Sequence, residues 1–146
     1  MIDAKWIGHR TNGSVLAIER GRLRFFAKVI GERDEIYTDV EAARRAGYAD
    51  LPAPPTFLFS AELDSGALFR MLEELEVPIA KILHGEQGFE YVAPVVAGDT
   101  VTVTTRIADI YAKKGGALEF ITTESWAVNQ HGNVVARLRS VIVVRH

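Results

Sequence analysis

Two groups of side chains in this sequence could move protons. In the first, a carboxylate, Glu32, is followed five residues later by a phenol, Tyr37. A tyrosine with an ordinary pKa of about 10 is ionised to only about one part in a thousand at pH 7, so Tyr37 is a poor general base. It can still donate a hydrogen bond to a substrate oxygen. The two residues are therefore either a catalytic pair of unusual composition, or a charged residue at a helix end and a partly buried phenol with no catalytic role.

The second group is the run His84-Gly85-Glu86-Gln87. Its imidazole, with an ordinary pKa of about 6.5, can exchange protons near neutral pH. Gly85 would let another chain or a ligand approach the backbone closely. His84 and Glu86 are thus candidate catalytic residues, and Gly85 and Gln87 are candidate substrate contacts. The alternative is a strand start whose polar side chains satisfy backbone groups across a dimer interface.

The composition excludes several classes of protein. A chain of 146 residues and 16.1 kDa fits one domain, residues 1–146, and 48% hydrophobic with 25% charged residues is typical of a globular protein. The net charge of −2 argues against a nucleic-acid partner. There is no cysteine and no cluster of metal-ligating residues, so we expect neither a disulfide nor a metal. The mixed residues 1–10 lack a secretory apolar run, which favours a cytoplasmic protein with no membrane partner.

The first half of the chain predicts helices. Apolar residues at spacings of three and four indicate a short amphipathic helix over 19–30, ended by Gly31. Thr38 is expected to cap a second short helix over 39–46. A third helical segment begins at Pro55 after a proline-rich stretch and reaches about residue 76. Its apolar positions predict a helix that is nearly all buried, and Gly66 makes a break or kink plausible.

The second half is dense in Val, Thr and Ile and predicts strands. Three long alternating stretches cover 99–111, 117–128 and 134–144, and glycine-containing turns at 113–116 and 129–132 suit hairpins between them. Two earlier strands are expected at 14–18 and 84–91. In the stretch 117–128 the alternating apolar side chains are Leu118, Phe120, Trp126 and Val128.

One long buried helix, one antiparallel sheet and no second helical layer leave a single simple arrangement. The sheet must wrap around the helix, which predicts an α+β protein with a single hot-dog fold, about five strands around one long central helix. An α+β sandwich of another topology would share the same elements. An exposed sheet edge and a remaining apolar outer surface would favour a dimer formed by continued strand pairing.

Four stretches of the sequence together resemble the N-terminal MaoC-like dehydratases, a FAS1-like dehydratase family. They lie at 25–32, 46–57, 83–91 and 96–100, in the family's order and with compatible spacing over almost the entire chain. The resemblance implies a hot-dog fold and reversible addition of water to an enoyl thioester of coenzyme A or acyl carrier protein, without a further cofactor. In the family, a loop Gly-Asp-x-Asn-Pro-aliphatic-His supplies the acid–base pair. Here Glu32 and Tyr37 occupy the Asp and His positions, and Glu35 replaces the proline.

The chemistry implied by the resemblance also needs donors for the thioester oxygen, which gains negative charge as the neighbouring proton leaves. The start of the helical segment near Pro55 is the natural place for them. Because prolines lack an N–H group, Thr56 and Phe57 would have to donate, and both are candidate substrate-binding residues.

Three hypotheses remain open on these residues. The first is a subunit of an enoyl-CoA hydratase or (3R)-hydroxyacyl-thioester dehydratase that shapes the acyl channel, while a partner chain supplies the Asp and His. The second is a self-sufficient homodimeric hydratase or thioesterase that uses His84 with Glu86 or Glu32. The third is a non-catalytic acyl-thioester binding module. The assignment requires the segment after Pro55 to be enclosed by the sheet, and Tyr37 to share a cleft with His84.

Overall fold

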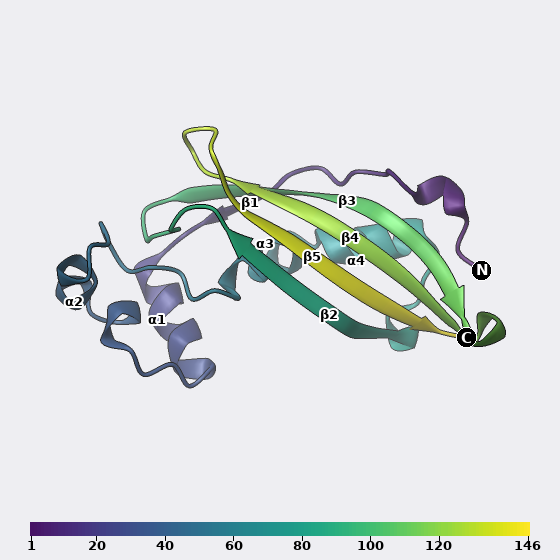
Figure 1. Ribbon diagram of the computed structural model, residues 1–146, viewed down its shortest axis with the longest axis horizontal. Helices are drawn as coiled ribbons and strands as arrows, with labels where there is room; N and C mark the ends of the chain where they lie inside the picture. The colour runs from purple at the N-terminus through teal and green to yellow at the C-terminus, as the bar shows by residue number, and fades with distance from the viewer.

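A curled antiparallel sheet packs against a helical segment in the computed structural model, which describes residues 1–146 (Figure 1). The elements in chain order are β1 (Ser14–Ala17), α1 (Arg20–Val29), α2 (Val40–Arg45), α3 (Ser60–Asp64), α4 (Ala67–Glu74), β2 (Ile82–Tyr91), β3 (Thr100–Lys113), β4 (Leu118–Val128) and β5 (Val134–Arg145). The strands lie in the order β1-β3-β4-β5-β2, and all neighbours are antiparallel. The predicted α+β hot-dog fold is confirmed, and both predicted hairpins form.

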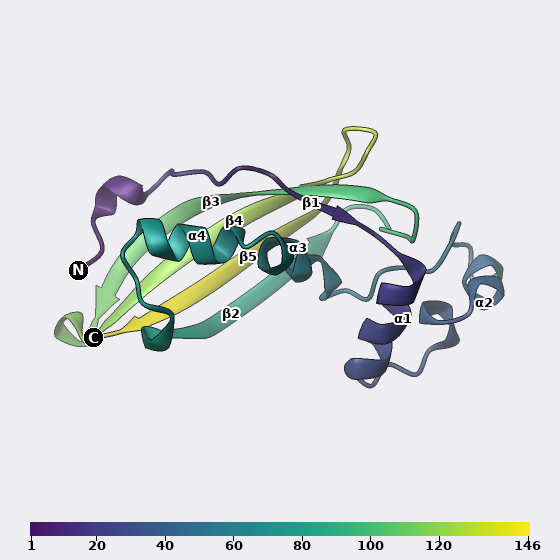
Figure 2. The same cartoon turned by 180° about the vertical axis from the view of Figure 1, so that it is seen from behind.

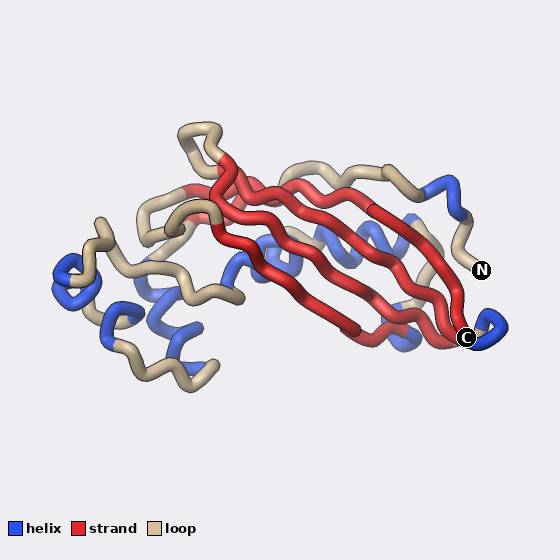
Figure 3. The backbone as a smooth tube through the Cα atoms, in the orientation of Figure 1, coloured by secondary structure: helices blue, strands red, loops and turns tan.

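Helices α1 and α2 project beyond one end of the sheet (Figure 3). Leu23 and Ala27 are the buried face of α1, and Gly31, with φ 73°, follows its end as predicted. The predicted cap of α2 is wrong by one residue. Asp39, rather than Thr38, caps this helix, because its carboxylate accepts two first-turn N–H groups at 2.8 and 3.4 Å.

The central helical segment is broken. A 3-10 turn at Phe57–Phe59 leads into α3, and Gly66, with φ 71°, separates α3 from α4, which confirms the predicted break. Both helices lie against one face of the sheet (Figure 2). The expectation that this segment is nearly all buried is wrong for its outer side, because no second layer covers it. Phe69 there is 43% exposed.

Strand β4 presents the opposite face to the core from the one that its apolar alternation indicated. The side chains buried beneath the helices are Ile121, Thr123, Ser125 and Ala127, each 4% exposed or less. The apolar set named from the sequence, including Phe120 and Trp126, is half-buried on the convex side. The sequence pattern was misleading because two of the inward residues are polar.

Those polar residues belong to a band that divides the core. One apolar cluster joins α1 and α3 to the β1-proximal part of the sheet and includes Leu23 and Phe57. A second joins α4 to the other ends of the strands and includes Met71 and Ile121. Between the clusters, on the concave face, lies a polar band that comprises Thr105 of β3, Thr123 and Ser125 of β4, and Ser140 of β5, each 8% exposed or less. Buried hydroxyls are costly unless hydrogen-bonded, so the band needs partners.

No helix in this chain has both the length and the hydropathy that crossing a bilayer requires.

Candidate functional site

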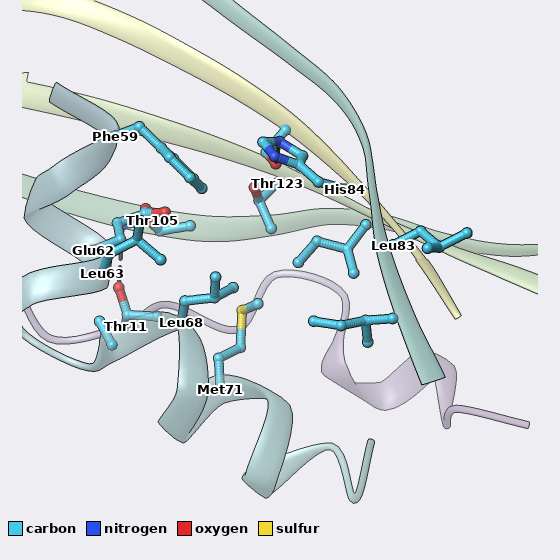
Figure 4. Close-up of a pocket in the computed structure, with 14 residues that line it drawn as sticks. Thr11, Phe59, Glu62, Leu63, Leu68, Met71, Leu83, His84, Thr105 and Thr123 are labelled. Atoms are coloured by element: carbon cyan, nitrogen blue, oxygen red, sulfur yellow. Dashed lines mark hydrogen bonds between the residues drawn. The ribbon is translucent and has the colours of Figure 1, made fainter. Parts of the chain in front are cut away.

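A cavity lies between the polar band and the helices (Figure 4). It has a volume of about 220 Å³ and 14 lining residues, of which eight are hydrophobic. Helices α3 and α4 supply an apolar wall that includes Leu63, Leu68 and Met71. The sheet supplies a polar wall that includes Thr105 and Thr123. The cavity is therefore amphipathic across its width.

Glu62 of α3 is the buried carboxyl group of this cavity. It is 8% exposed, and its Oε1 accepts hydrogen bonds from the hydroxyls of Thr105 and Ser125, the latter at 3.0 Å. These two hydroxyls also lie 2.8 Å from each other. The carboxyl group thus connects the helix to the polar band. The sequence analysis did not identify Glu62 as a candidate site residue. The missed signal was its position four residues after Leu58, on the face that packs against the sheet.

His84 lines the same cavity from β2. Its ring stacks on Phe59, with centroids 5.1 Å apart and planes inclined by 26°. Its Nε2 lies 3.2 Å from Oε1 of Gln87 and 3.4 Å from Oγ of Ser140. The imidazole is therefore held between an aromatic ring and the polar band.

A β-bulge at Gly85 explains why His84 and Gln87 share one face. Residues three apart in a regular strand point to opposite faces, but the extra residue in the bulge reverses the alternation. A Cβ at Gly85 would lie 2.9 Å from Cγ2 of Val143 and 3.0 Å from the carbonyl oxygen of Val141, so the close approach predicted here is to β5 of the same chain. Glu86 pairs at 3.0 Å with Arg139, an outward-facing residue of β5. The structure therefore separates Glu86 from the cavity that His84 lines.

Glu32 and Tyr37 lie in the projecting region, away from His84. Oε1 of Glu32 accepts the N–H groups of Arg33 at 2.8 Å and Asp34 at 3.0 Å, so this carboxylate closes its own turn. Tyr37 lines a second cavity, and burial together with the charge of Glu32 raises its pKa. The expectation that Tyr37 and His84 share a cleft is wrong for the single chain, because the projection carries Tyr37 beyond the end of the sheet.

The second cavity is aromatic and rich in proline. Tyr48 and Tyr91 line it beside Tyr37. The hydroxyl of Tyr91 donates to the carbonyl oxygen of Pro55 at 2.7 Å, and burial raises the pKa of this phenol. This bond ties the end of β2 to the segment that leads into α3.

The two predicted thioester-oxygen donors are placed differently. The N–H of Phe57 already donates to the carbonyl oxygen of Pro54 at 2.9 Å, and its side chain is 1% exposed in the core against Phe26. Phe57 is therefore a core residue rather than a substrate contact. Thr56 is exposed, and its N–H makes no hydrogen bond within the chain, so one of the two donors is free.

Comparison with known proteins identifies the family. A family model described as "FAS1-like, dehydratase domain region" matches residues 5–138. The chain belongs to the FAS1-like dehydratase family. A UPF0336 protein of Streptomyces griseus is 34% identical over 146 residues, which cover 99% of this chain and 95% of that protein. A UPF0336 protein of Streptomyces avermitilis is 39% identical over 98 residues, which cover 67% of this chain and 65% of that protein.

Solved structures of similar fold carry related names. A MaoC-like dehydratase superposes with a TM-score of 0.84 and 25% identity, covering 96% of this chain and 42% of that one. The HadBC (3R-hydroxyacyl-ACP dehydratase) complex of Mycobacterium tuberculosis gives 0.83 and 22%, covering 94% and 96%, and this likeness shows the fold alone. The resemblance of this FAS1-like dehydratase to the MaoC-like dehydratases is confirmed.

An ion pair anchors the projection of this FAS1-like dehydratase. Arg20 of α1 donates to both carboxylate oxygens of Asp50, from Nε at 2.9 Å and from Nη2 at 2.5 Å. Asp50 also accepts the N–H of Leu51 at 2.8 Å. Mainly through the bond from Arg20, the pKa of Asp50 is lowered to about 2. The pair fixes α1 against the segment that leads to α3.

We expect Asp50→Asn to lower stability by about 1 kcal/mol or less at neutral pH, because the pair is partly exposed. A carboxyl group whose folded pKa is about 2, below the ordinary unfolded value of about 3.9, stabilises the fold above pH ~4. This contribution is lost as the pH falls towards 2. Urea unfolding of both proteins from pH 7 to pH 2 should show their difference shrinking in that window. The exposed Asp109→Asn variant is the control, and an equal response from it would contradict the assignment.

Proposed function

We propose that this chain is a subunit of an enoyl-thioester hydratase or (3R)-hydroxyacyl-thioester dehydratase. Its cavity holds part of the acyl chain of a coenzyme A or acyl-carrier-protein thioester, and a second hot-dog chain supplies the Asp and His. The observation that carries the proposal is the state of Glu32 and Tyr37. A carboxylate bound to its own turn and a phenol of raised pKa occupy the family's acid–base positions.

The reaction explains why that observation matters. Removing the proton beside a thioester carbonyl requires a group that exchanges protons near pH 7, within hydrogen-bond reach of the substrate. The raised pKa of Tyr37 moves its phenol further from that range. The proposal leaves two roles to this chain: it binds the acyl group, and the free N–H of Thr56 donates a hydrogen bond to the thioester oxygen. Neither role requires a group that exchanges protons.

The unpaired edge of β2 supports assembly with a partner. This ten-residue strand is the last in the sheet order and pairs only with β5. Leu83 on it is 48% exposed, and Ile79 just before it is 57% exposed. A long exposed edge with apolar residues is suited to pairing with the edge of another sheet. The similar HadBC structure is itself a complex by its name.

A second candidate is a self-sufficient homodimeric hydratase or thioesterase. It is favoured by the presence of His84 and Glu62 in one cavity, since an imidazole and a carboxyl group are a common acid–base combination. Glu86 and Glu32, the carboxylates first considered for this role, do not line that cavity. A non-catalytic acyl-binding module would bind thioesters without turnover in any assembly.

The test is hydration of crotonyl-coenzyme A by the purified chain, alone and after assembly with a MaoC-like chain that carries the complete loop. We expect background rates from the chain alone and activity from the complex. Tyr37→Phe in the complex should change kcat by about threefold or less, since only one hydrogen bond is removed. Substantial activity of the chain alone that His84→Ala abolishes would select the homodimeric enzyme instead.

A further inference from the structure

The cavity has an unusual wall for a site that would hold only a hydrocarbon chain. Each of the strands β3, β4 and β5 places a hydroxyl on it, from Thr105, Thr123 and Ser140. The inward neighbours along the same strands, such as Val103, Ile107 and Ile121, are apolar and 1% exposed or less. On each of these strands, the hydroxyl that lines the cavity thus has an apolar neighbour on the same face.

Glu62 offers an unused oxygen to this cavity. Its Oε1 accepts two hydroxyls, whereas no group of the protein bonds to its Oε2. Only one side-chain nitrogen or oxygen in the protein is both fully buried and without a hydrogen-bond partner, and that atom is Nε of Arg106. Since Oε2 of Glu62 also has no partner, it is not fully buried and is therefore accessible. Glu62 is 8% exposed and lines the cavity, so we take the cavity as the place from which a ligand reaches Oε2.

Thr123 offers a second polar group in the same way. Its residue is 3% exposed and its hydroxyl has no protein partner, yet this oxygen is not among the fully buried atoms. Beside Glu62 on the helices, and across the cavity from Thr123 on the sheet, lie the apolar side chains of Leu63, Leu68 and Met71. A ligand that matches the cavity must therefore be apolar on one side and form hydrogen bonds on the other.

We propose that the cavity selects acyl chains that carry a hydroxyl group on a carbon beyond the thioester and its two reacting carbons. The hydroxyl bonds to Oε2 of Glu62, and the rest of the chain packs against the apolar helix wall. Glu62 is then a specificity-determining residue. This inference rests on the proposed function, since it presumes that the ligand is an acyl thioester.

A hydroxyl fits these groups better than a charged substituent does. It donates to an ionised carboxylate and accepts from a neutral carboxylic acid, so it pairs with Glu62 in either protonation state. A second carboxylate would be repelled by Glu62 in its ionised form, and an ammonium group would lose its hydration on entering. An unsubstituted chain leaves Oε2 and the hydroxyl of Thr123 without partners once it displaces water.

The test compares binding of four probes to the full chain, and to its complex with the catalytic chain, by titration calorimetry. The probes are decanoyl-coenzyme A and its 6-, 8- and 10-hydroxy derivatives. We expect at least one hydroxylated probe to bind about tenfold more tightly than decanoyl-coenzyme A, as one hydrogen bond to a buried carboxyl group allows. Glu62→Met, similar in length and apolar, should remove this preference. Glu73→Met, an exposed change on α4, should retain it.

The outcomes distinguish a failure of the proposed hydroxyl selectivity from a failure of the proposed function. If decanoyl-coenzyme A binds and no hydroxylated probe binds more tightly, the selectivity is wrong and the proposed function stands. If none of the four probes binds to the chain or to the complex, the proposed function fails as well. The comparison on the unmodified protein decides the selectivity even if Glu62→Met does not fold. A preference that survives in a folded Glu62→Met variant would remove Glu62 from the role.

Discussion

Leu68→Trp is expected to lower kcat/KM of the assembled enzyme for a ten-carbon 2-enoyl thioester by about 100-fold, because a displaced substrate loses its reactive alignment. Leu68 points from α4 into the cavity (Figure 4), and the larger ring would occupy the space that the acyl chain requires. Crotonyl-coenzyme A, whose acyl group is too short to need that space, should lose about threefold or less. Steady-state kinetics on both substrates measure the split.

The neighbouring Phe69→Trp variant is the matched control. Phe69 lies in the same helix but is 43% exposed and does not line the cavity. The Phe69→Trp variant should leave kcat/KM for both substrates nearly unchanged. An equal loss on both substrates from Leu68→Trp would indicate damage to the fold or to the assembly. Unchanged kinetics on the longer substrate would place the acyl chain elsewhere, and the aromatic cavity of Tyr37, Tyr48 and Tyr91 would become the leading candidate.

Phe57→Ala is expected to lower the free energy of unfolding by about 3–5 kcal/mol, the usual cost of removing a buried aromatic ring. Phe57 is 1% exposed, packs edge-on against Phe26 with centroids 5.2 Å apart, and has the Arg22 guanidinium 5.5 Å from its ring centroid. It therefore joins α1 to the helical segment over the sheet. Urea unfolding followed by circular dichroism measures the loss.

Phe25→Ala removes the same ring from an exposed position and serves as the control. Phe25 precedes Phe26 in α1 but is 68% exposed, so its loss should change stability by about 0.5 kcal/mol or less. A stable Phe57→Ala protein that had lost thioester binding would return Phe57 to the role of a substrate contact. The predicted result would instead account for this position by packing alone.

Local patterns were sufficient for the elements of this protein. Alternation located β3, β4 and β5, glycines located both hairpins, and Gly66 indicated the break between α3 and α4. These features depend on residues close in the sequence, through strand periodicity and positive φ. The same reasoning misassigned the faces of β4. Its apolar alternation follows Phe120 and Trp126, whereas the core receives Thr123 and Ser125. Periodicity reports that two faces differ, but not which one the helices cover.

The candidate site was predicted less completely, because it depends on contacts between residues that are far apart in the sequence. His84 was predicted as a candidate catalytic residue, but its hydrogen bond to Gln87 depends on a bulge at Gly85, which packs closely against β5. Glu62 was not identified as part of the site. Its significance comes from two hydroxyls that lie 43 and 63 residues away in the chain.

The sequence by itself determined an α+β hot-dog fold and the spacing of Glu32 and Tyr37, because residue types, spacing and turn chemistry are local properties of the chain. Only the tertiary structure decided that Tyr37 and His84 line different cavities, that Glu86 faces outward, and that Glu62 meets a polar band. Those facts depend on the register between strands and on which sheet face the helices cover. Contacts between distant residues set both, and no short stretch of sequence contains them.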